Sequence, residues 1–182
     1  MRGYFGIGVE GVSKAMNVGN LFRTAHAFGA SFVFTIDAQY KRADTERSDT
    51  SRTAQQVPLY EFASVEALRL PTDCALVGME LVDDADTLPS FRHPRCAAYV
   101  LGPERGALSA RLTARCERVV RIPTKFSVNL AVAGAIVMYD RLISLGRHAE
   151  RPVAAGGAPL ALAPHEFGRP IMRRRRAMTK GG

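Results

Sequence analysis

Apolar residues gather in five short runs along the chain, and these runs predict β-strands. Each run is continuous and is bounded by Gly, Pro or charged residues, which is typical of strands buried on both faces. The runs span Tyr4–Val9, Ser31–Ile36, Cys74–Leu81, Ala97–Leu101 and Arg118–Ile122. Helical spacing of apolar residues predicts helices at Asn17–Phe28, Val65–Leu70 and Ser109–Cys116. This alternation predicts an α/β domain with a mostly parallel sheet flanked by helices.

A last helix is predicted at about 129–145, and it is apolar almost all the way round. Such a helix needs cover on more than one side. One side can pack on the sheet of its own chain, and the small residues between Ala131 and Ala135 would let another element approach closely. A second copy of the chain is the simplest cover for the other side of this helix, so a homodimer is expected. Burial under loops of the same chain is the alternative.

The composition changes at Gly146. Residues 1–146 hold all the predicted elements and are interpreted as one domain, whereas residues 147–182 are interpreted as a basic, largely disordered tail. The tail carries eight Lys or Arg and two Glu, so it accounts for +6 of the formal net charge of +8. Such a tail favours nucleic acid or another polyanion as partner, with a solvated terminus as the alternative. Residues 41–56 contain almost nothing apolar, which predicts an exposed functional loop.

Composition excludes several other classes of protein. With 47% hydrophobic and 23% charged residues among 182, the chain is not disordered throughout. It has no apolar run of about 20 residues, as a membrane helix requires, and Glu10 interrupts its start too early for a secretory signal. The three cysteines are odd in number, and the four histidines show no ligand spacing, so neither a disulfide framework nor a metal site is expected. A cytoplasmic protein is predicted.

One glycine motif is set aside because its context is wrong. Residues Gly6–Gly11 satisfy the G-x-G-x-x-G pattern of dinucleotide-binding folds. However, the first glycine lies inside a predicted strand, and the helix begins only near Asn17. The sequence also has no acidic residue about 20 positions further on, where such folds contact the ribose. A nicotinamide-dependent dehydrogenase is therefore not expected.

The first predicted helix presents a candidate functional arginine. Val18, Leu21, Phe22, Ala25 and Phe28 fall on one helical face, and Arg23 points away from it. The residues one turn on either side of Arg23 are small, which leaves room for a phosphate, a ribose or another subunit. An ordinary solvated arginine is the alternative.

Two further segments follow predicted strands. Gly102–Gly106 forms a turn after one of them, and open α/β sheets bind ligands beyond the carboxyl ends of their strands. Ser127 and Asn129 lie where the last helix would begin. Taken alone, Glu104 can be a turn residue, and Ser127 and Asn129 can be helix caps.

Together these segments resemble the motifs of the SpoU/TrmH family of knotted RNA methyltransferases, over roughly residues 4–146. The family's first motif contains Asn, Gly and Arg-Thr-Ala, as Asn17–Ala25 does. Its second motif is Gly-x-Glu-x-x-Gly, to which Gly102–Gly106 is similar. Its third motif joins Ile-Pro to Ser-x-Asn and an Ala/Val-rich helix, as in Ile122–Asn129 and the residues that follow.

The resemblance implies a fold and a cofactor. The expected fold is a parallel α/β sheet whose C-terminal segment threads a loop in a deep trefoil knot. The expected assembly is a homodimer packed through the first and last helices. The knot would hold S-adenosylmethionine. By position in the motifs, the residues implied to line the cofactor site are Gly78, Leu101, Gly102, Ile122 and Val128.

The reaction implied by the resemblance is methyl transfer from S-adenosylmethionine to a ribose 2′-hydroxyl of RNA, with tRNA favoured over rRNA. A guanidinium stays protonated in proteins and is a poor general base. Arg23 is therefore expected to bind the adjacent phosphate and to stabilise charge on the 2′-oxygen, in the site of the other subunit. The residues implied to position Arg23, the ribose and the cofactor are Asn17, Glu104, Ser127 and Asn129.

Contacts to the RNA backbone are expected from basic residues of the polar loop and of the tail. These are Lys41, Arg42, Arg47, Arg52, Arg173, Arg174, Arg175 and Arg176. Two alternatives are a knotted RNA-binding protein without catalysis and a knotted enzyme that methylates a base. The presence of all five polar motif residues favours an enzyme, and the Asn17–Arg23 pair favours the ribose.

Overall fold

One parallel sheet lies at the centre of the structure, in the strand order β3-β2-β1-β6-β4-β7-β5. All its ladders are parallel. The mostly parallel α/β sheet expected from the sequence is thus confirmed. The strands are β1 (Tyr4–Glu10), β2 (Phe32–Ile36), β3 (Leu59–Phe62), β4 (Ala75–Met79), β5 (Asp86–Thr87), β6 (Cys96–Leu101) and β7 (Arg118–Arg121).

The structure, a computed structural model, describes residues 3–39 and 56–146, together with 148, 151 and 155–157. Residues 1–146 form one compact unit, and residues 147–182 are a second unit. In the described part of the chain, no helix has both the length and the apolar character needed to span a membrane. The cytoplasmic location stays a prediction.

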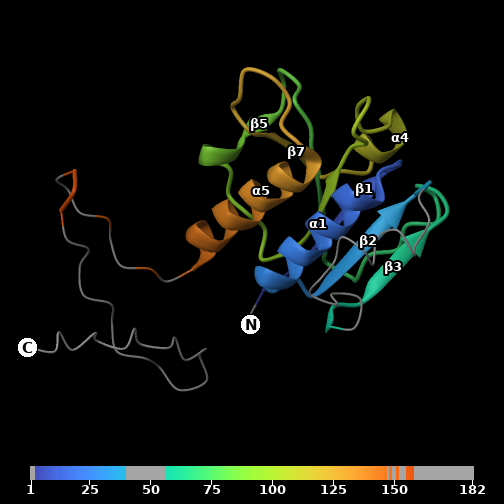
Figure 1. Cartoon of the computed structure of the whole chain (residues 1–182), viewed down its shortest axis with the longest axis horizontal. Helices are drawn as coiled ribbons and strands as arrows, with labels where there is room; N and C mark the ends of the chain where they lie inside the picture. The colour runs from blue at the N-terminus through green and yellow to red at the C-terminus, as the bar shows by residue number, and fades with distance from the viewer. Residues whose placement is uncertain (1–2, 40–55, 147, 149–150, 152–154, 158–182) are drawn as a thin grey trace, which may run out of the picture. The chain divides into compact units, whose positions relative to one another are not determined.

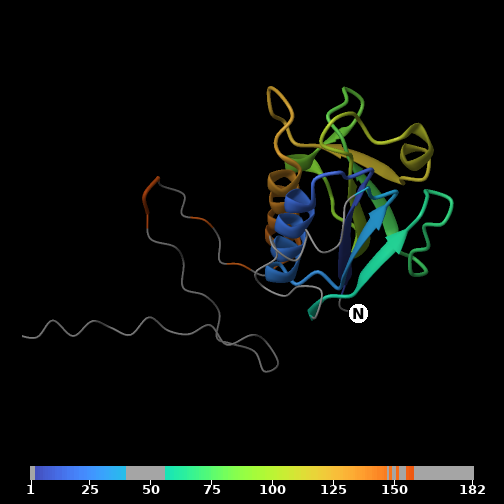
Figure 2. The ribbon, with the colours of Figure 1, turned by 45° about the vertical axis from the view of Figure 1, so that its right-hand side comes forward.

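The helices cover the two faces of the sheet, as Figures 1 and 2 show. Helices α1 (Ala15–Ala27) and α5 (Leu130–Leu145) lie together on one face. The short helix α4 (Ala110–Thr113) packs on the other. Strand side chains alternate between the two faces, so Val33 joins the core under α1 while Phe34 joins the core under α4. A short 3₁₀ helix, η1 (Leu88–Ser90), follows β5.

A glycine brings α1 and α5 of the same chain into close contact. Gly134 is buried, and a Cβ atom added to it would lie 2.3 Å from Cδ1 of Leu21. This small residue therefore serves packing within the chain, where the element that approaches it is α1. Other positions of α5 remain open, with Val132, Tyr139, Leu142 and Leu145 exposed. The described residues therefore do not bury the whole of α5 under loops of the same chain.

The predicted helix at Val65–Leu70 is wrong, because the segment forms turns. It holds only six residues before Pro71, too few to offset the cost of helix nucleation. Its carbonyl groups bond elsewhere: Arg115 donates to the carbonyl oxygens of Val65 and Leu68. The predicted helix at Ser109–Cys116 is real but shorter, and Ser109 caps it by accepting from the Leu112 amide at 3.2 Å.

A buried polar cluster fastens the second half of α5 to the sheet. Arg141 donates to the carbonyl oxygens of Pro94 and Arg95. His93 contacts the Tyr99 hydroxyl through Nδ1 at 2.6 Å and the Asp140 carboxylate through Nε2 at 2.9 Å. Burial lowers the pKa of His93 below 6.5, although the hydrogen bond to Asp140 acts in the opposite direction. The neutral ring therefore accepts from Tyr99 and donates to Asp140.

Candidate active site

A cavity of about 350 Å³ opens at the carboxyl ends of β4, β6 and β7. Its walls come from the start of α1, the end of β4, the turn after β6, and the segment that runs from β7 into α5. Parallel sheets commonly bind ligands at this edge. The volume lies within the range of about 300–1,000 Å³ that is typical of small-molecule sites.

The carboxylate of Glu104 joins the turn after β6 to the start of α1. It accepts from Asn17 Nδ2 at 3.0 Å and from the backbone amide of Lys14 at 3.2 Å. A longer contact of 3.4 Å comes from the amide of Ser13. The amides of Ser13 and Lys14 lie just before α1, and Asn17 is in its first turn, so this carboxylate binds the start of the helix from outside. Glu104 therefore fixes α1 relative to the cavity.

The hydrogen bonds around Glu104 also set its ionisation. Partial burial raises the pKa of this carboxyl, but the bonds donated by Asn17 and by the backbone amides of Ser13 and Lys14 outweigh it. The net result is a pKa below the usual 4.5. Glu104 is thus an ionised acceptor near neutral pH, and its low basicity suits holding other groups better than removing protons.

Asn17 passes this connection on to α5. Its Oδ1 atom accepts from Asn129 Nδ2 at 3.1 Å, while its own Nδ2 donates to Glu104. Asn129 also caps α5, because its Oδ1 accepts from the amide of Ala131 at 2.9 Å. Three residues from three motifs thus form one chain of hydrogen bonds along the cavity wall. Ser127 lines the same cavity and is exposed.

Most of the residues expected to hold a cofactor line this cavity. Leu101, Gly102, Ile122 and Val128 all do so. A Cβ atom on Gly102 would lie 3.0 Å from the amide nitrogen of Leu108, so only glycine fits without movement of the backbone. Gly78 is outside the lining. It faces Cys116 and Leu108 on the other side of the sheet, where its lack of a side chain serves packing.

Arg23 does not line the cavity of its own chain. It is exposed on α1, six residues beyond Asn17, which places it about 9 Å further along the helix. At 100° per residue the two side chains also leave the helix in different directions. The structure therefore brings Asn17, Glu104 and Asn129 together but leaves Arg23 apart from them.

Glu80 and Lys14 also line the cavity and were not among the sequence-based candidates. Glu80 follows the end of β4, and its carboxylate accepts from the amides of Leu108 at 2.8 Å and Leu81 at 2.9 Å. It thereby holds the turn after β6 against β4. The sequence could have indicated Glu80 by its position, since an acidic residue directly after a buried strand lies at the ligand-binding edge of a parallel sheet.

The basic residues expected to contact RNA lie outside the described residues. This applies to Lys41, Arg42, Arg47 and Arg52 in the polar loop and to Arg173, Arg174, Arg175 and Arg176 in the tail. Within residues 3–39 and 56–146 no group of His, Cys, Asp or Glu is arranged to hold a metal ion. The three cysteines are free thiols, and burial raises the pKa of Cys116 to about 11.

A parallel sheet covered on both faces, with a cavity at the carboxyl ends of β4, β6 and β7, defines an α/β protein with a candidate small-molecule site. Comparison with known protein families assigns the chain to one of them. Residues 5–139 match the SpoU rRNA Methylase family. The chain belongs to this family.

Individual relatives agree with this assignment. Over 138 residues the chain is 26% identical to the mouse tRNA (guanosine(18)-2′-O)-methyltransferase TARBP1, covering 71% of this chain and 9% of that protein. Over 151 residues it is 28% identical to the 23S rRNA (guanosine-2′-O-)-methyltransferase RlmB of Nitrosomonas europaea, covering 79% of this chain and 56% of that one. The chain thus spans a small part of the first relative and about half of the second.

Solved structures show the same fold. An AdoMet-bound rRNA methyltransferase from Sinorhizobium meliloti superposes with a TM-score of 0.70 at 20% sequence identity. The match covers 80% of this chain and 58% of the other. At this identity the likeness concerns the fold, and it includes the parallel sheet that carries the cavity.

Proposed function

We propose that this protein is an S-adenosylmethionine-dependent methyltransferase acting on a ribose 2′-hydroxyl of RNA. The observation that carries the proposal is the chain of hydrogen bonds from Glu104 through Asn17 to Asn129 along one wall of the cavity. Family membership and the names of the two curated relatives support the same reaction.

The lining residues fit S-adenosylmethionine. Leu101, Ile122 and Val128 offer apolar surface for an adenine ring, and Gly102 adds no side chain to the wall that it helps to form. When bound, this cofactor supplies a methyl group on a positively charged sulfur, which is already activated for transfer. The protein's own task is then to align the hydroxyl and to stabilise the charge that develops on its oxygen.

The polar residues of the cavity wall act as positioning groups. Glu104 is a weak base because its carboxylate already accepts several hydrogen bonds. The side-chain amides of Asn17 and Asn129 already form hydrogen bonds, since Asn129 donates to Asn17 and accepts from the Ala131 amide at the start of α5. Ser127, which is exposed at the cavity, is available to contact the ribose or the cofactor.

Arg23 is assigned to the phosphate beside the reacting ribose and to the developing charge on the 2′-oxygen. Its distance along α1 from Asn17 argues that it serves the cavity of a second copy of the chain. The exposed apolar side of α5 supports a homodimer that would bring it there. The deep trefoil knot of the family is proposed for this chain on the resemblance of its motifs.

The RNA substrate is proposed to be tRNA, with rRNA as the alternative. The named substrate of TARBP1 is tRNA and that of RlmB is 23S rRNA. Purified protein is incubated with methyl-labelled S-adenosylmethionine and either RNA, and the modified nucleoside is identified by nuclease digestion and mass spectrometry. A 2′-O-methylated nucleoside supports the proposal. A methylated base, or RNA binding without methyl transfer, supports one of the two alternative functions instead.

A mixed-dimer experiment tests the role of Arg23. Arg23→Ala and Gly102→Val chains, each inactive alone, are combined and allowed to exchange subunits. If Arg23 serves the partner's cavity, the mixed dimer contains one intact site and activity returns. If Arg23 serves its own cavity, both sites are damaged and the mixture stays inactive. Arg92→Ala, which changes an exposed arginine away from the cavity, is the control and retains activity.

A further inference from the structure

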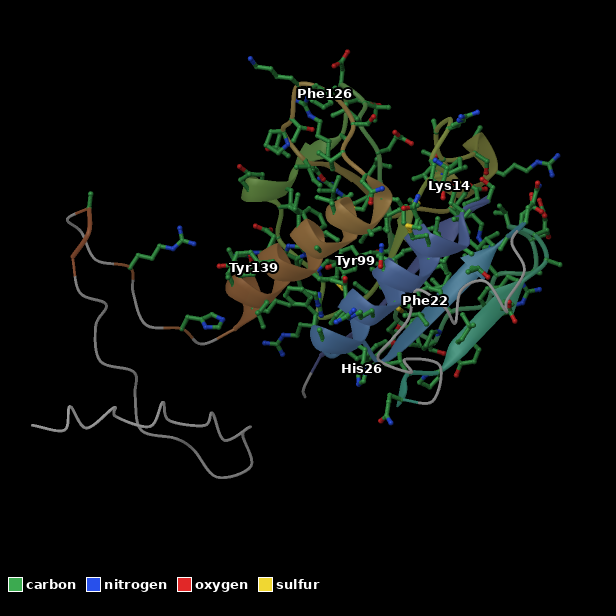
Figure 3. The ribbon with its side chains drawn as sticks, viewed as in Figure 1. Lys14, Phe22, His26, Tyr99, Phe126 and Tyr139 are labelled. Carbon is green, nitrogen blue, oxygen red and sulfur yellow. The ribbon has the colours of Figure 1, made fainter. Side chains whose placement is uncertain are left out.

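Phe126 is the most exposed large hydrophobic residue of the described chain, with 75% of its surface accessible. It stands between β7 and α5, on the loop that leads into the start of α5, where Figure 3 labels it. Single exposed apolar residues are common on proteins and need no explanation by themselves. The position of this ring, however, between residues that line the cavity gives it a possible use.

The loop that carries Phe126 is held in shape by its own hydrogen bonds. The Thr124 amide donates to the Ile122 carbonyl oxygen at 2.7 Å, and the Thr124 hydroxyl donates to the Phe126 carbonyl oxygen at 2.9 Å. Pro123 restricts the backbone further. On the other side of the ring, Asn129 fixes the start of α5. The ring is therefore presented to solvent by a backbone pinned at both ends.

The loop also places the ring beside the cavity. Thr124, Ser127 and Val128 all line the cavity, so residues on both sides of Phe126 belong to its wall. Three peptide units separate Phe126 from Asn129, so their Cα atoms are at most about 11 Å apart. A ring at this distance can contact the base of a nucleotide whose ribose enters the cavity.

Cationic side chains are carried by the segments that form the cavity, whose lining also includes the carboxylates of Glu80 and Glu104. Lys125 is exposed next to Phe126, and Lys14 lines the wall formed by α1. Arg105 is exposed on the turn after β6. Proteins bind single-stranded nucleic acid by stacking an exposed ring on a base while nearby cations contact phosphates, and the pair Lys125–Phe126 offers one group of each kind.

We propose that Phe126 is the surface on which an unpaired base of the RNA substrate stacks, with Lys125 contacting an adjacent phosphate. The inference rests on the proposed function and adds a residue that positions the nucleotide. Stacking does not select a particular base, so recognition of sequence lies elsewhere.

Two substitutions separate stacking from simple apolar contact. Phe126→Leu keeps apolar bulk but removes the aromatic ring, and it is expected to weaken RNA binding by about 5- to 150-fold. The affinity for S-adenosylmethionine, measured by calorimetry, stays at the wild-type value. Phe126→Tyr keeps the ring and binds RNA as the wild type does. Lys125→Ala weakens binding at low salt and reduces the dependence of affinity on salt by about one phosphate contact.

A fluorescent variant observes the stacking directly. The chain has no tryptophan, so Phe126→Trp introduces a single one. Addition of a short single-stranded RNA is expected to quench its emission, whereas inorganic polyphosphate leaves the emission unchanged. This readout does not need methyl transfer. It therefore distinguishes failure of the inference from failure of the proposed function, which would show as quenching without methylation by any variant.

Three results would overturn the inference. Wild-type RNA affinity in Phe126→Leu, with no quenching in Phe126→Trp, would mean that the ring does not contact RNA. Weaker cofactor binding in Phe126→Leu would assign the ring to S-adenosylmethionine. Conversion of Phe126→Leu to monomers in analytical ultracentrifugation would assign it to the contact between two copies of the chain.

Discussion

Asn17 and Asn129 lie 112 residues apart in the chain, yet Asn129 Nδ2 donates to Asn17 Oδ1 at 3.1 Å. This bond ties the first turn of α1 to the N-terminal cap of α5. α1 and α5 pack side by side on one face of the sheet, so this bond holds together two helix starts that line the same cavity.

Replacing Asn129 is expected to affect both stability and the site. Asn129→Ala loses the cap and the bond to Asn17, at a cost of about 1 kcal/mol each. Asn129→Asp keeps an oxygen for the cap but loses the donor to Asn17, so it recovers most of the stability without recovering activity. Urea denaturation and methyl-transfer rates measure the two effects. Asn20→Ala, at an exposed position of α1, is the control. Equal activity in the Asp variant and the wild type would show that the link is dispensable.

A side chain at Gly102 is expected to close the cavity to the cofactor. In Gly102→Val the new Cβ meets backbone atoms of Ala107 and Leu108 at 3.0–3.3 Å, so the turn must shift. Overpacking of this size costs about 1–3 kcal/mol, and we expect S-adenosylmethionine to bind at least tenfold more weakly by calorimetry. Ala114→Val, on the exposed end of α4, should bind normally. Unchanged affinity in Gly102→Val would place the cofactor elsewhere.

Stability is expected to fall in mild acid because of His93. Its folded-state pKa lies below the ordinary 6.5, so the unfolded chain takes up a proton first as the pH falls below that value. The contribution of the neutral ring is complete above pH 6.5 and is lost as the pH falls through the folded pKa. Urea midpoints between pH 7.5 and 5.0 measure the effect. His93→Gln should flatten the profile, and NMR titration of the His93 ring gives its pKa independently.

A charge on the open side of α5 is expected to separate two copies of the chain. Leu142 is 44% exposed, and Leu142→Asp would place a carboxylate within the proposed apolar contact, where burial is costly. We expect monomers in analytical ultracentrifugation and loss of methyl transfer, because Arg23 would no longer reach a partner's cavity. Val82→Asp introduces the same charge at another exposed apolar position and should leave the mass unchanged. A monomeric wild type would remove the basis for this prediction.

Deletion of residues 150–182 is expected to weaken RNA binding and to leave cofactor binding intact. The deleted segment contains the arginine run 173–176, and each lost phosphate contact should lower the dependence of RNA affinity on salt. Filter binding at several salt concentrations measures both quantities. Equal affinity with and without these residues would assign RNA binding to the remainder of the protein.

The strands that sequence could predict are those whose apolar character is sufficient by itself. β1, β2, β4 and β6 are apolar runs in the centre of the sheet. The strand predicted at Arg118–Ile122 is also found, as β7. β3 lies at one edge and mixes a glutamate and a tyrosine with its apolar residues, while β5 has only two residues. Their strand character comes from pairing with neighbours distant in sequence, which a local pattern does not contain.

The site was predictable only in part for a similar reason. Asn17, Glu104 and Asn129 were identified by the resemblance of their motifs, and the structure joins them. Glu80 belongs to no motif, and its role follows from the amide of Leu108, a residue 28 positions away. Gly78 was assigned to the cofactor by position along the chain, but strand alternation turns it to the other face of the sheet.

The bonds that build the cavity have a consequence for how the protein is made. Glu104 pairs with Ser13 across 91 residues, and Asn129 pairs with Asn17 across 112. Contacts of such high sequence separation slow folding, since long loops must close before the contacts form. On the ribosome, α1 emerges long before its partners in the cavity wall, and the pocket is assembled only after α5 has been synthesised. Chains that stop short of α5 should therefore lack cofactor affinity altogether.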